Sequence, residues 1–327
     1  MLSTIANIVH SVNNSKYFLN FEYTPYVFMY NLSKKLNNRI WFKREDLTPI
    51  HTFKLRGAFH NIMTRHENDN KLNTVITCSA GNHAAGVAYT SEMLNIKNTI
   101  VIPSNTAKVK IDKIKSLGGN VIVRGSNYDE AQKWTLDYAS FKGYSLIHPF
   151  NDILTISGQA TIAYELLRQH DINSYGLLDY IFVPVGGGGL IAGITTYFNI
   201  YSPNTRIIGV EEYGSNALSK SHRKGELVEL DNINTFCDGA AVRSLGDIPY
   251  KLIRHKIYDV VEVSESDICN SIRDIYNETR TIIEPAGALS WAGCKKYLYK
   301  NGLESRNIAI LTTGANMDLD RLVKIMK

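Results

Sequence analysis

The chain has 327 residues, of which 44% are hydrophobic and 20% are charged, and its formal net charge is only +5. These values are normal for a soluble globular protein, and the length suggests about two domains. The lysines and arginines are dispersed rather than clustered, so no nucleic-acid partner is expected. No apolar stretch is long enough to span a bilayer, so a membrane protein is not expected either.

The four cysteines are widely spaced and form no pair typical of a redox motif or a metal site; they are Cys78, Cys237, Cys269 and Cys294. We therefore expect free thiols in a reducing compartment. The N-terminal segment MLSTIANIVHSVNN has no basic region before its short apolar stretch, so it does not resemble a signal peptide. Together these features predict a cytoplasmic protein.

Apolar, β-branched runs alternate along the chain with polar or glycine-rich turns and with helix-like segments. The first run, NTVITC, leads through SAGNH into a helical segment, and the second, NTIVIP, precedes the helical segment AKVKIDKIKSLGG. The predicted strands cover residues 73–78, 98–103, 120–125, 179–185, 205–212 and 307–313. Apolar strands that alternate with helices predict parallel sheets in an α/β fold.

These strands fall into two groups, and residues 143–152 cross from one group to the other. We predict a small domain over residues 50–145 and a large domain made of residues 1–49 and 146–327. Open parallel sheets bind ligands at the carboxyl ends of their strands. The turns that follow residues 78, 185 and 313 can therefore face one cleft between the two domains.

The segment VGGGGL (185–190) follows a predicted strand and opens a predicted helix. Glycines let backbone N–H groups approach an anion closely, and a helix N-terminus attracts negative charge. A phosphate group is the expected ligand. The segment also fits a dinucleotide fingerprint, with Gly187, Gly189 and Ala192 in the pattern and Glu211 at the end of the next strand. That alternative, an oxidoreductase, leaves the SAGNH and TGAN turns without a role.

Lys54 lies in HTFKLRGAF, between an aromatic residue and a helical run. Taken alone, it is most simply a solvated lysine. A phosphate loop, a lysine and polar turns at strand ends are together what pyridoxal 5′-phosphate (PLP) requires. Its aldehyde needs an amine, its phosphate needs N–H donors, and its ring needs polar partners.

Six motifs in chain order resemble those of the serine/threonine dehydratase family of fold-type II PLP enzymes. They are KREDLTPIHTFKLRGA (43–58), SAGNHAAGVA (79–88), VPVGGGGLIAG (183–193), DGAAV (238–242), EPAGA (284–288) and TGANMDLDRL (313–322). The resemblance implies the tryptophan synthase β-like fold, in which PLP lies between two open α/β domains. It also implies a carbon–oxygen lyase that deprotonates Cα of L-threonine or L-serine, eliminates the β-hydroxyl and yields a 2-oxo acid and ammonia.

The resemblance also assigns roles to individual residues. Lys54 would form the Schiff base and act as general base, Phe53 would pack beside the ring, and Asn82 would bond the 3′ oxygen. Thr313 would bond the pyridine nitrogen, where the family usually has serine. The phosphate would be bound by Gly186, Gly187, Gly188, Gly189 and Leu190. The substrate carboxylate would be bound by Ser79, Ala80, Gly81, Asn82 and His83.

Two positions bear on the choice of reaction. Serine racemases carry a serine as second acid/base where this chain has Ala80, which disfavours racemisation. Threonine dehydratases usually have glutamine where this chain has Ala85, and a change near the substrate can alter side-chain preference. A racemase, or a dehydratase of another β-hydroxy amino acid, stays open as an alternative.

Other residues have two readings. Glu284 can lie near the cofactor or cap the helix over 286–296, and His83 can be catalytic or structural. Glu211 forms part of a cation site in some relatives, but the expected companion acid is missing, so no metal is predicted. The chain ends just after TGAN, so no C-terminal regulatory domain is expected. The resemblance implies a homo-oligomer, a dimer or a tetramer, in isoleucine biosynthesis or threonine catabolism.

Overall fold

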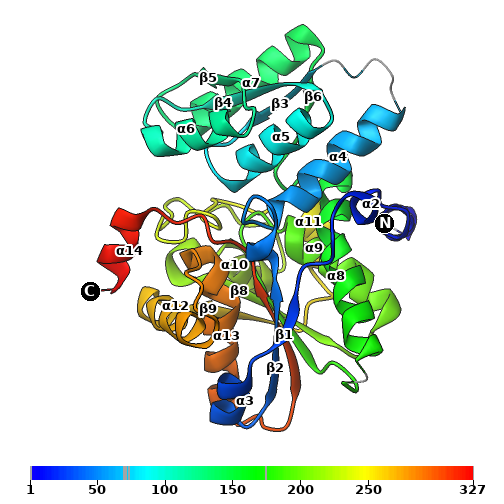
Figure 1. Cartoon of the computed structure of the whole chain (residues 1–327), viewed down its shortest axis with the longest axis vertical. Helices are drawn as coiled ribbons and strands as arrows, with labels where there is room; N and C mark the ends of the chain where they lie inside the picture. The colour runs from blue at the N-terminus through cyan, green and yellow to red at the C-terminus, as the bar shows by residue number, and fades with distance from the viewer. Residues whose placement is uncertain (1, 69–71, 73, 174, 327) are drawn as a thin grey trace.

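The computed structural model describes residues 2–68, 72, 74–173 and 175–326, and it contains two separate sheets (Figure 1). The large sheet has the order β1-β2-β10-β7-β8-β9, and the small sheet has the order β5-β4-β3-β6. The large sheet comprises β1 (Tyr26–Phe28), β2 (Arg39–Arg44), β7 (Tyr180–Pro184), β8 (Arg206–Glu212), β9 (Asp259–Val263) and β10 (Asn307–Thr312). The small sheet comprises β3 (Thr74–Cys78), β4 (Lys97–Ile102), β5 (Val121–Val123) and β6 (Ser145–Leu146).

Among the described strands, all neighbours pair in parallel except β1 and β2, which are antiparallel. This arrangement confirms the predicted α/β class with parallel sheets. Each predicted run overlaps one of the observed strands, although β4 begins one residue before its predicted run and the run at 73–78 includes residue 73, which lies outside the described part of the chain. Four strands, β1, β2, β6 and β9, have no counterpart in the prediction.

Charge explains why β2 was missed. Three of the six residues of RIWFKR are basic, so the run does not read as apolar. In the structure, Lys43 of this strand is fully buried because an acidic partner lies beside it. β9 has a similar problem, since two of the five residues of DVVEV are acidic, and β6 is only two residues long.

Helices cover both sheets, and we call each sheet with its helices the small unit and the large unit. Helix α4 contacts α5 of the small unit and α8 of the large unit. In Figure 1, α4 lies where the two units meet. None of the helices in the described residues is long and apolar enough to cross a membrane. The helices are α1 (Leu2–Asn13), α2 (Tyr17–Asn20), α3 (Tyr30–Leu36), α4 (Lys54–Asn68), α5 (Asn82–Met93), α6 (Lys108–Ser116), α7 (Tyr128–Lys142), α8 (Ile153–Ile172), α9 (Gly189–Tyr201), α10 (Ala217–Lys224), α11 (Asp247–Ile253), α12 (Glu265–Thr279), α13 (Pro285–Asn301) and α14 (Leu319–Met326).

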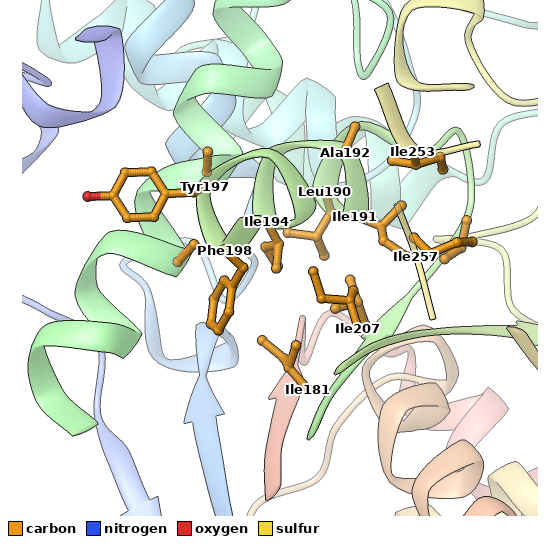
Figure 2. Packing of buried hydrophobic residues seen from close by; sticks show 14 of the residues in the cluster. Ile181, Leu190, Ile191, Ala192, Ile194, Tyr197, Phe198, Ile207, Ile253 and Ile257 are labelled. Carbon is orange, nitrogen blue, oxygen red and sulfur yellow. The ribbon is translucent and has the colours of Figure 1, made fainter. Parts of the chain in front are cut away.

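Helix α9 begins directly after the glycine segment and is buried for most of its length. Figure 2 shows Ile191, Ile194 and Phe198 of α9 on the side that faces Ile181 of β7 and Ile207 of β8. An apolar helix packed on an apolar sheet is held by the burial of its side chains. The core therefore fixes the start of α9, and with it the glycine segment.

A cluster of buried charges lies below the start of α4. The guanidinium of Arg56 contacts the carboxylates of Glu45 at 2.7 Å and Glu165 at 2.6 Å, and Lys43 contacts Glu165 at 2.6 Å. All four side chains are fully buried, and their charges sum to zero. Removing one partner from such a cluster leaves an uncompensated buried charge, which costs about 3–5 kcal/mol. The cluster therefore ties the first turn of α4 to β2 and α8.

Candidate active site

A cavity opens at the carboxyl ends of β7 and β10, in the large sheet. The residues that line it are Phe53, Lys54, Phe150, Pro184, Gly186, Gly187, Gly188, Gly189, Leu190, Gly239, Ala240, Ala286 and Thr313. Every residue predicted to bind the cofactor is in this list except Asn82. Residues far apart in the sequence thus meet at the sheet edge where ligands of α/β folds bind.

Lys54 is the first residue of α4, and its side chain reaches into this cavity. Its Nζ donates a hydrogen bond to the carbonyl oxygen of Pro149 at 3.1 Å and lies 5.1 Å from the centre of the Phe53 ring. Burial lowers the pKa of Lys54 to about 8, and the nearby carboxylate of Glu284 opposes this shift. A lysine with such a pKa has an appreciable neutral fraction near neutral pH, and it can act as a nucleophile or a base.

Backbone pairing holds Lys54 and Thr313 together. The N–H of Phe53 donates to the carbonyl oxygen of Thr313 at 3.0 Å, and Thr52 forms a β-bridge with Gly314. The Thr313 hydroxyl is buried and donates to the carbonyl oxygen of Ala286 at 3.3 Å. The segments on either side of Lys54 and Thr313 therefore move as one unit.

The glycine segment forms the N-terminus of α9. Gly188 has a φ of +86°, in the left-handed region that favours glycine. The first N–H groups of a helix have no partner within the helix, and their dipoles attract an anion. The segment lines the cavity, so these donors are available where a phosphate is predicted.

The glycines are also required by packing, which the sequence did not reveal. A Cβ on Gly187 would lie 2.3 Å from the ring of Phe150, and one on Gly186 would lie 2.9 Å from the carbonyl oxygen of Ala240. Both distances are far below normal contact. The loop therefore needs glycine to fit against its neighbours, in addition to any need to approach an anion.

The donor set of the cavity fits PLP. A lysine with a lowered pKa suits an aldehyde, and the N-terminus of α9 suits a phosphate. The Phe53 ring offers an apolar surface, and the Thr313 hydroxyl offers a polar partner. Within the described residues, no group of three His, Cys, Asp or Glu side chains is placed to hold a metal ion. Glu211, the possible cation ligand, instead accepts backbone N–H groups from Leu218 and Ser219.

The loop predicted to bind the substrate carboxylate, residues 79–83, connects β3 to α5. Gly81 at its tip is exposed, and a Cβ added there would have no atom within 4 Å. The Ser79 hydroxyl accepts the N–H of Gly81 at 3.3 Å. None of the five residues is among those that line the cavity. The loop is linked to the large unit through Asn82, which bonds Glu284.

His83 is buried, and its Nε2 bonds the carbonyl oxygen of Ile147 at 2.9 Å. Burial, together with the charge of Lys54, lowers the pKa of His83 to about 3. The imidazole is therefore neutral, and it anchors the start of α5 to the strand connection beside it. This geometry favours the structural reading of His83 over the catalytic one.

The structure also decides between the two readings of Glu284. The residue occupies the N-cap position of α13, but its side chain makes no capping bond. Its carboxylate instead accepts hydrogen bonds from Asn82 at 2.8 Å and from the backbone of Asn316 at 3.1 Å. Glu284 therefore faces the site and does not cap the helix.

Ala85 is not among the residues that line the cavity. It is buried in an apolar cluster with Tyr17, Leu55 and Phe59, away from the cavity. This position does not support a direct contact with the substrate side chain, and the effect of residue 85 on substrate preference stays a prediction. Sequence proximity to SAGNH suggested it, but the turn of α5 carries Ala85 onto another face.

Several cavity residues were not singled out from the sequence. Three of them, Gly239, Ala240 and Ala286, lie within the DGAAV and EPAGA motifs. The sequence revealed these motifs but assigned no role to these three residues. Phe150 had no such signal. Its ring packs on the glycine segment only because residues 143–152 cross between the sheets.

The chain is similar to known proteins over most of its length. A family model described as "Pyridoxal-phosphate dependent enzyme" matches residues 17–314. The chain is 43% identical over 293 residues to the mitochondrial threonine dehydratase of Schizosaccharomyces pombe, across 89% of this chain and 48% of that protein. The chain spans about half the length of the curated relatives it matches.

Two solved structures are similar over nearly the whole chain. The processed form of threonine deaminase isoform 2 from Solanum lycopersicum has a TM-score of 0.93 at 38% identity, across 98% of this chain and 92% of that chain. Maize serine racemase has a TM-score of 0.88 at 30% identity, across 97% of this chain and 96% of that chain.

Proposed function

The chain belongs to the family of pyridoxal-phosphate dependent enzymes, and from this premise we propose that it converts L-threonine to 2-oxobutanoate and ammonia, and L-serine to pyruvate and ammonia. One observation carries the proposal. Lys54, with its lowered pKa, shares a cavity with an N–H-rich glycine segment and the hydroxyl of Thr313. Amine, anion site and hydroxyl are the three elements that PLP chemistry on an amino acid needs.

The cavity residues and the neighbouring Asn82 would each bind a different part of the cofactor. Residues 186–190 would hold the phosphate through backbone N–H groups, and Phe53 would cover one edge of the ring. Thr313 would bond the pyridine nitrogen, and Asn82 the 3′ oxygen. The bound cofactor supplies an aldehyde and an electron-withdrawing ring, which together acidify the Cα proton of the substrate.

Lys54 would first hold the cofactor covalently and then take the Cα proton of the substrate at Nζ. The lowered pKa supports this, because the amine must be neutral to accept a proton. Pro149 offers the carbonyl oxygen that keeps Nζ in the cavity. Ser79 and the N–H groups at the start of α5 would hold the substrate carboxylate, since a helix N-terminus attracts anions.

The proposal is tested by 2-oxo acid release from the purified PLP-loaded protein, with L-threonine and L-serine assayed in parallel. We expect release from threonine, and a fall of about 10³-fold or more in Lys54→Ala. Lys108→Ala, which removes an exposed lysine at the start of α6, is the matched control and should keep full activity. Full activity in Lys54→Ala would overturn the proposal.

Chiral analysis of serine after incubation separates the lyase from the racemase alternative. Ala80 offers no group that can carry a proton, so we expect no D-serine above background. Accumulation of D-serine at a rate comparable to pyruvate release would move the function to racemisation. We further propose that the two sheets mark the small and large domains, and that the protein acts as a homo-oligomer in a reducing compartment, in isoleucine biosynthesis or threonine catabolism.

A further inference from the structure

Glu284 joins three segments of the fold beside the cavity. The residue is only 7% exposed. Its Oε1 accepts an N–H of the Asn82 amide at 2.8 Å, and its Oε2 accepts the backbone N–H of Asn316 at 3.1 Å. One carboxylate therefore binds the first residue of α5, in the small unit, and the loop that follows Thr313, in the large unit.

Asn316 completes the arrangement. Its side-chain Nδ2 donates to Oδ1 of Asn82 at 2.8 Å and to the carbonyl oxygen of Ile50 at 3.1 Å, and its Oδ1 accepts from Nζ of Lys113. Both ends of the Asn82 amide are thus engaged, the oxygen by Asn316 and one N–H by Glu284. An amide nitrogen carries two hydrogens, so one N–H of Asn82 is left for a ligand.

This cluster borders the cavity. A Cβ on Gly239, which lines the cavity, would lie 3.4 Å from Oε1 of Glu284 and 4.0 Å from Nδ2 of Asn82. A Cβ on Gly314 would lie 2.5 Å from the same carboxylate oxygen. The glycines at 239 and 314 therefore make room for the carboxylate next to the predicted place of the cofactor ring.

Glu284 has an electrostatic effect as well as a geometric one. Burial, together with the charge of Asp238, raises the pKa of Glu284 to about 7, although the hydrogen bonds from Asn82 and Asn316 and the charge of Lys113 oppose this rise. Its carboxylate also raises the pKa of Lys54. An experiment on Glu284 must therefore separate the loss of charge from the loss of hydrogen bonds.

We propose that Glu284 is a positioning residue, which fixes the Asn82 amide so that its remaining N–H meets the 3′ oxygen of the cofactor ring. The inference rests on the proposed function, and in particular on the role proposed for Asn82. A donor held by two partners keeps one orientation, so binding does not have to order it. Without Glu284, Asn82 is held only through its oxygen and can turn.

Three variants separate the two effects. Glu284→Ala removes the charge and both acceptors. Glu284→Gln removes the charge but keeps a carbonyl oxygen that can accept from Asn82. Asp238→Asn is the matched control, because Asp238 is a neighbouring carboxylate whose bonds go to Lys110 and Arg321 and not to Asn82.

The measurement is equilibrium binding of two ligands to the cofactor-free protein, followed by visible absorption. One ligand is PLP, and the other is the analogue in which hydrogen replaces the ring hydroxyl. We expect Glu284→Ala to weaken PLP about tenfold, the loss of roughly one hydrogen bond, and to weaken the analogue about twofold or less. Glu284→Gln and Asp238→Asn should change neither affinity by more than about twofold. Thermal unfolding of each variant confirms that it is folded.

Two results would overturn the inference. If Glu284→Ala weakened both ligands equally, the residue would not act through the ring oxygen, and if Glu284→Gln weakened PLP as much as Glu284→Ala, charge alone would explain the effect. The variant Asn82→Ala tests the role of Asn82 separately. If it weakened the binding of PLP and of the analogue equally, Asn82 would not bind the ring oxygen. A wild-type protein that does not bind PLP would contradict the proposed function instead.

Discussion

The two loops that meet at the candidate site are built in opposite ways. In the segment 186–189, the direction of every absent Cβ is filled by a neighbouring group, including the ring of Phe150 and the backbone of Ala240. In the loop 79–83, the tip glycine is exposed, and an added Cβ would touch nothing. The first loop is a closely packed wall, and the second is an open edge.

This difference matches what each loop is proposed to bind. A phosphate has the same shape in every turnover, so a fixed wall can be fitted to it in advance. A substrate enters and leaves, and its binding surface must be accessible. The lesson is that glycine serves two purposes in one site, close packing in the first loop and open access in the second.

The largest expected difference is between alanine substitutions of a glycine in each of the two loops. Because a Cβ on Gly187 would overlap Phe150 at 2.3 Å, we expect Gly187→Ala to lower the free energy of unfolding by about 1–3 kcal/mol and to weaken PLP binding. Gly81→Ala should change stability by less than about 0.5 kcal/mol. Denaturant unfolding and PLP titration of both variants check this.

A second substitution tests the cause. Removing the ring in the double variant Gly187→Ala with Phe150→Ala makes room for the new Cβ. The double variant should therefore cost less than the sum of the two single changes. Additive costs would show that the overlap with Phe150 is not what makes glycine necessary at 187.

A substitution at Ala85, on the side of α5 that faces away from the cavity, should change the stability of the protein and not its substrate specificity. Ala85 is buried among Tyr17, Leu55 and Phe59, so Ala85→Gln places an amide in an apolar cluster and should cost about 1–2 kcal/mol. The ratio of threonine to serine turnover should stay within about twofold, because position 85 does not reach the cavity. A large change in this ratio with unchanged stability would contradict the assignment.

Low pH should lower the stability of the folded protein through His83, which anchors the start of α5 next to the loop 79–83. The pKa of His83 is lowered to about 3 in the folded protein, so the unfolded chain binds a proton that the folded chain rejects between about pH 6.5 and pH 3. Stability is therefore lost as pH falls through this range, by up to about 1.4 kcal/mol per pH unit for this group. Unfolding measured from pH 7 to pH 4 should have a shallower slope in His83→Gln, and an unchanged slope would contradict the neutral state.

The smallest expected effect is a shift in the pH dependence of chemical labelling of Lys54, which lines the cavity together with residues 186–189. Its pKa of about 8 predicts that, in the cofactor-free protein, labelling of this amine by an acylating reagent reaches half its maximal rate near pH 8. Exposed lysines should reach it near about 10.4. Mass spectrometry of the peptide that carries Lys54 gives the rate, with Lys108 as the internal control. Equal midpoints for the two residues would exclude the lowered pKa.

Residue chemistry and strand patterns predicted the elements that form the walls of the site. The run VPVGGGGL combined an apolar strand with an unusual turn, and both signals are local. β2 was missed because its buried Lys43 is neutralised by Glu165 on α8, a distant partner that a local pattern does not contain. The side of α5 on which Ala85 lies, and the packing of Phe150 on Gly187, likewise depend on contacts between distant segments.

Helix α4 precedes the strands of the small sheet in the chain, and α8 follows them. The chain leaves the large unit along α4 and returns along α8, and these helices pack side by side. Arg65 near the end of α4 pairs with Asp152 just before α8 at 2.9 Å, and Asn61 donates to Thr155 at 2.9 Å. The small unit is thus an insert with adjacent ends. A short bridge could close the gap left by its removal, and a related insert could replace it, while the buried charges below Lys54 stay in place.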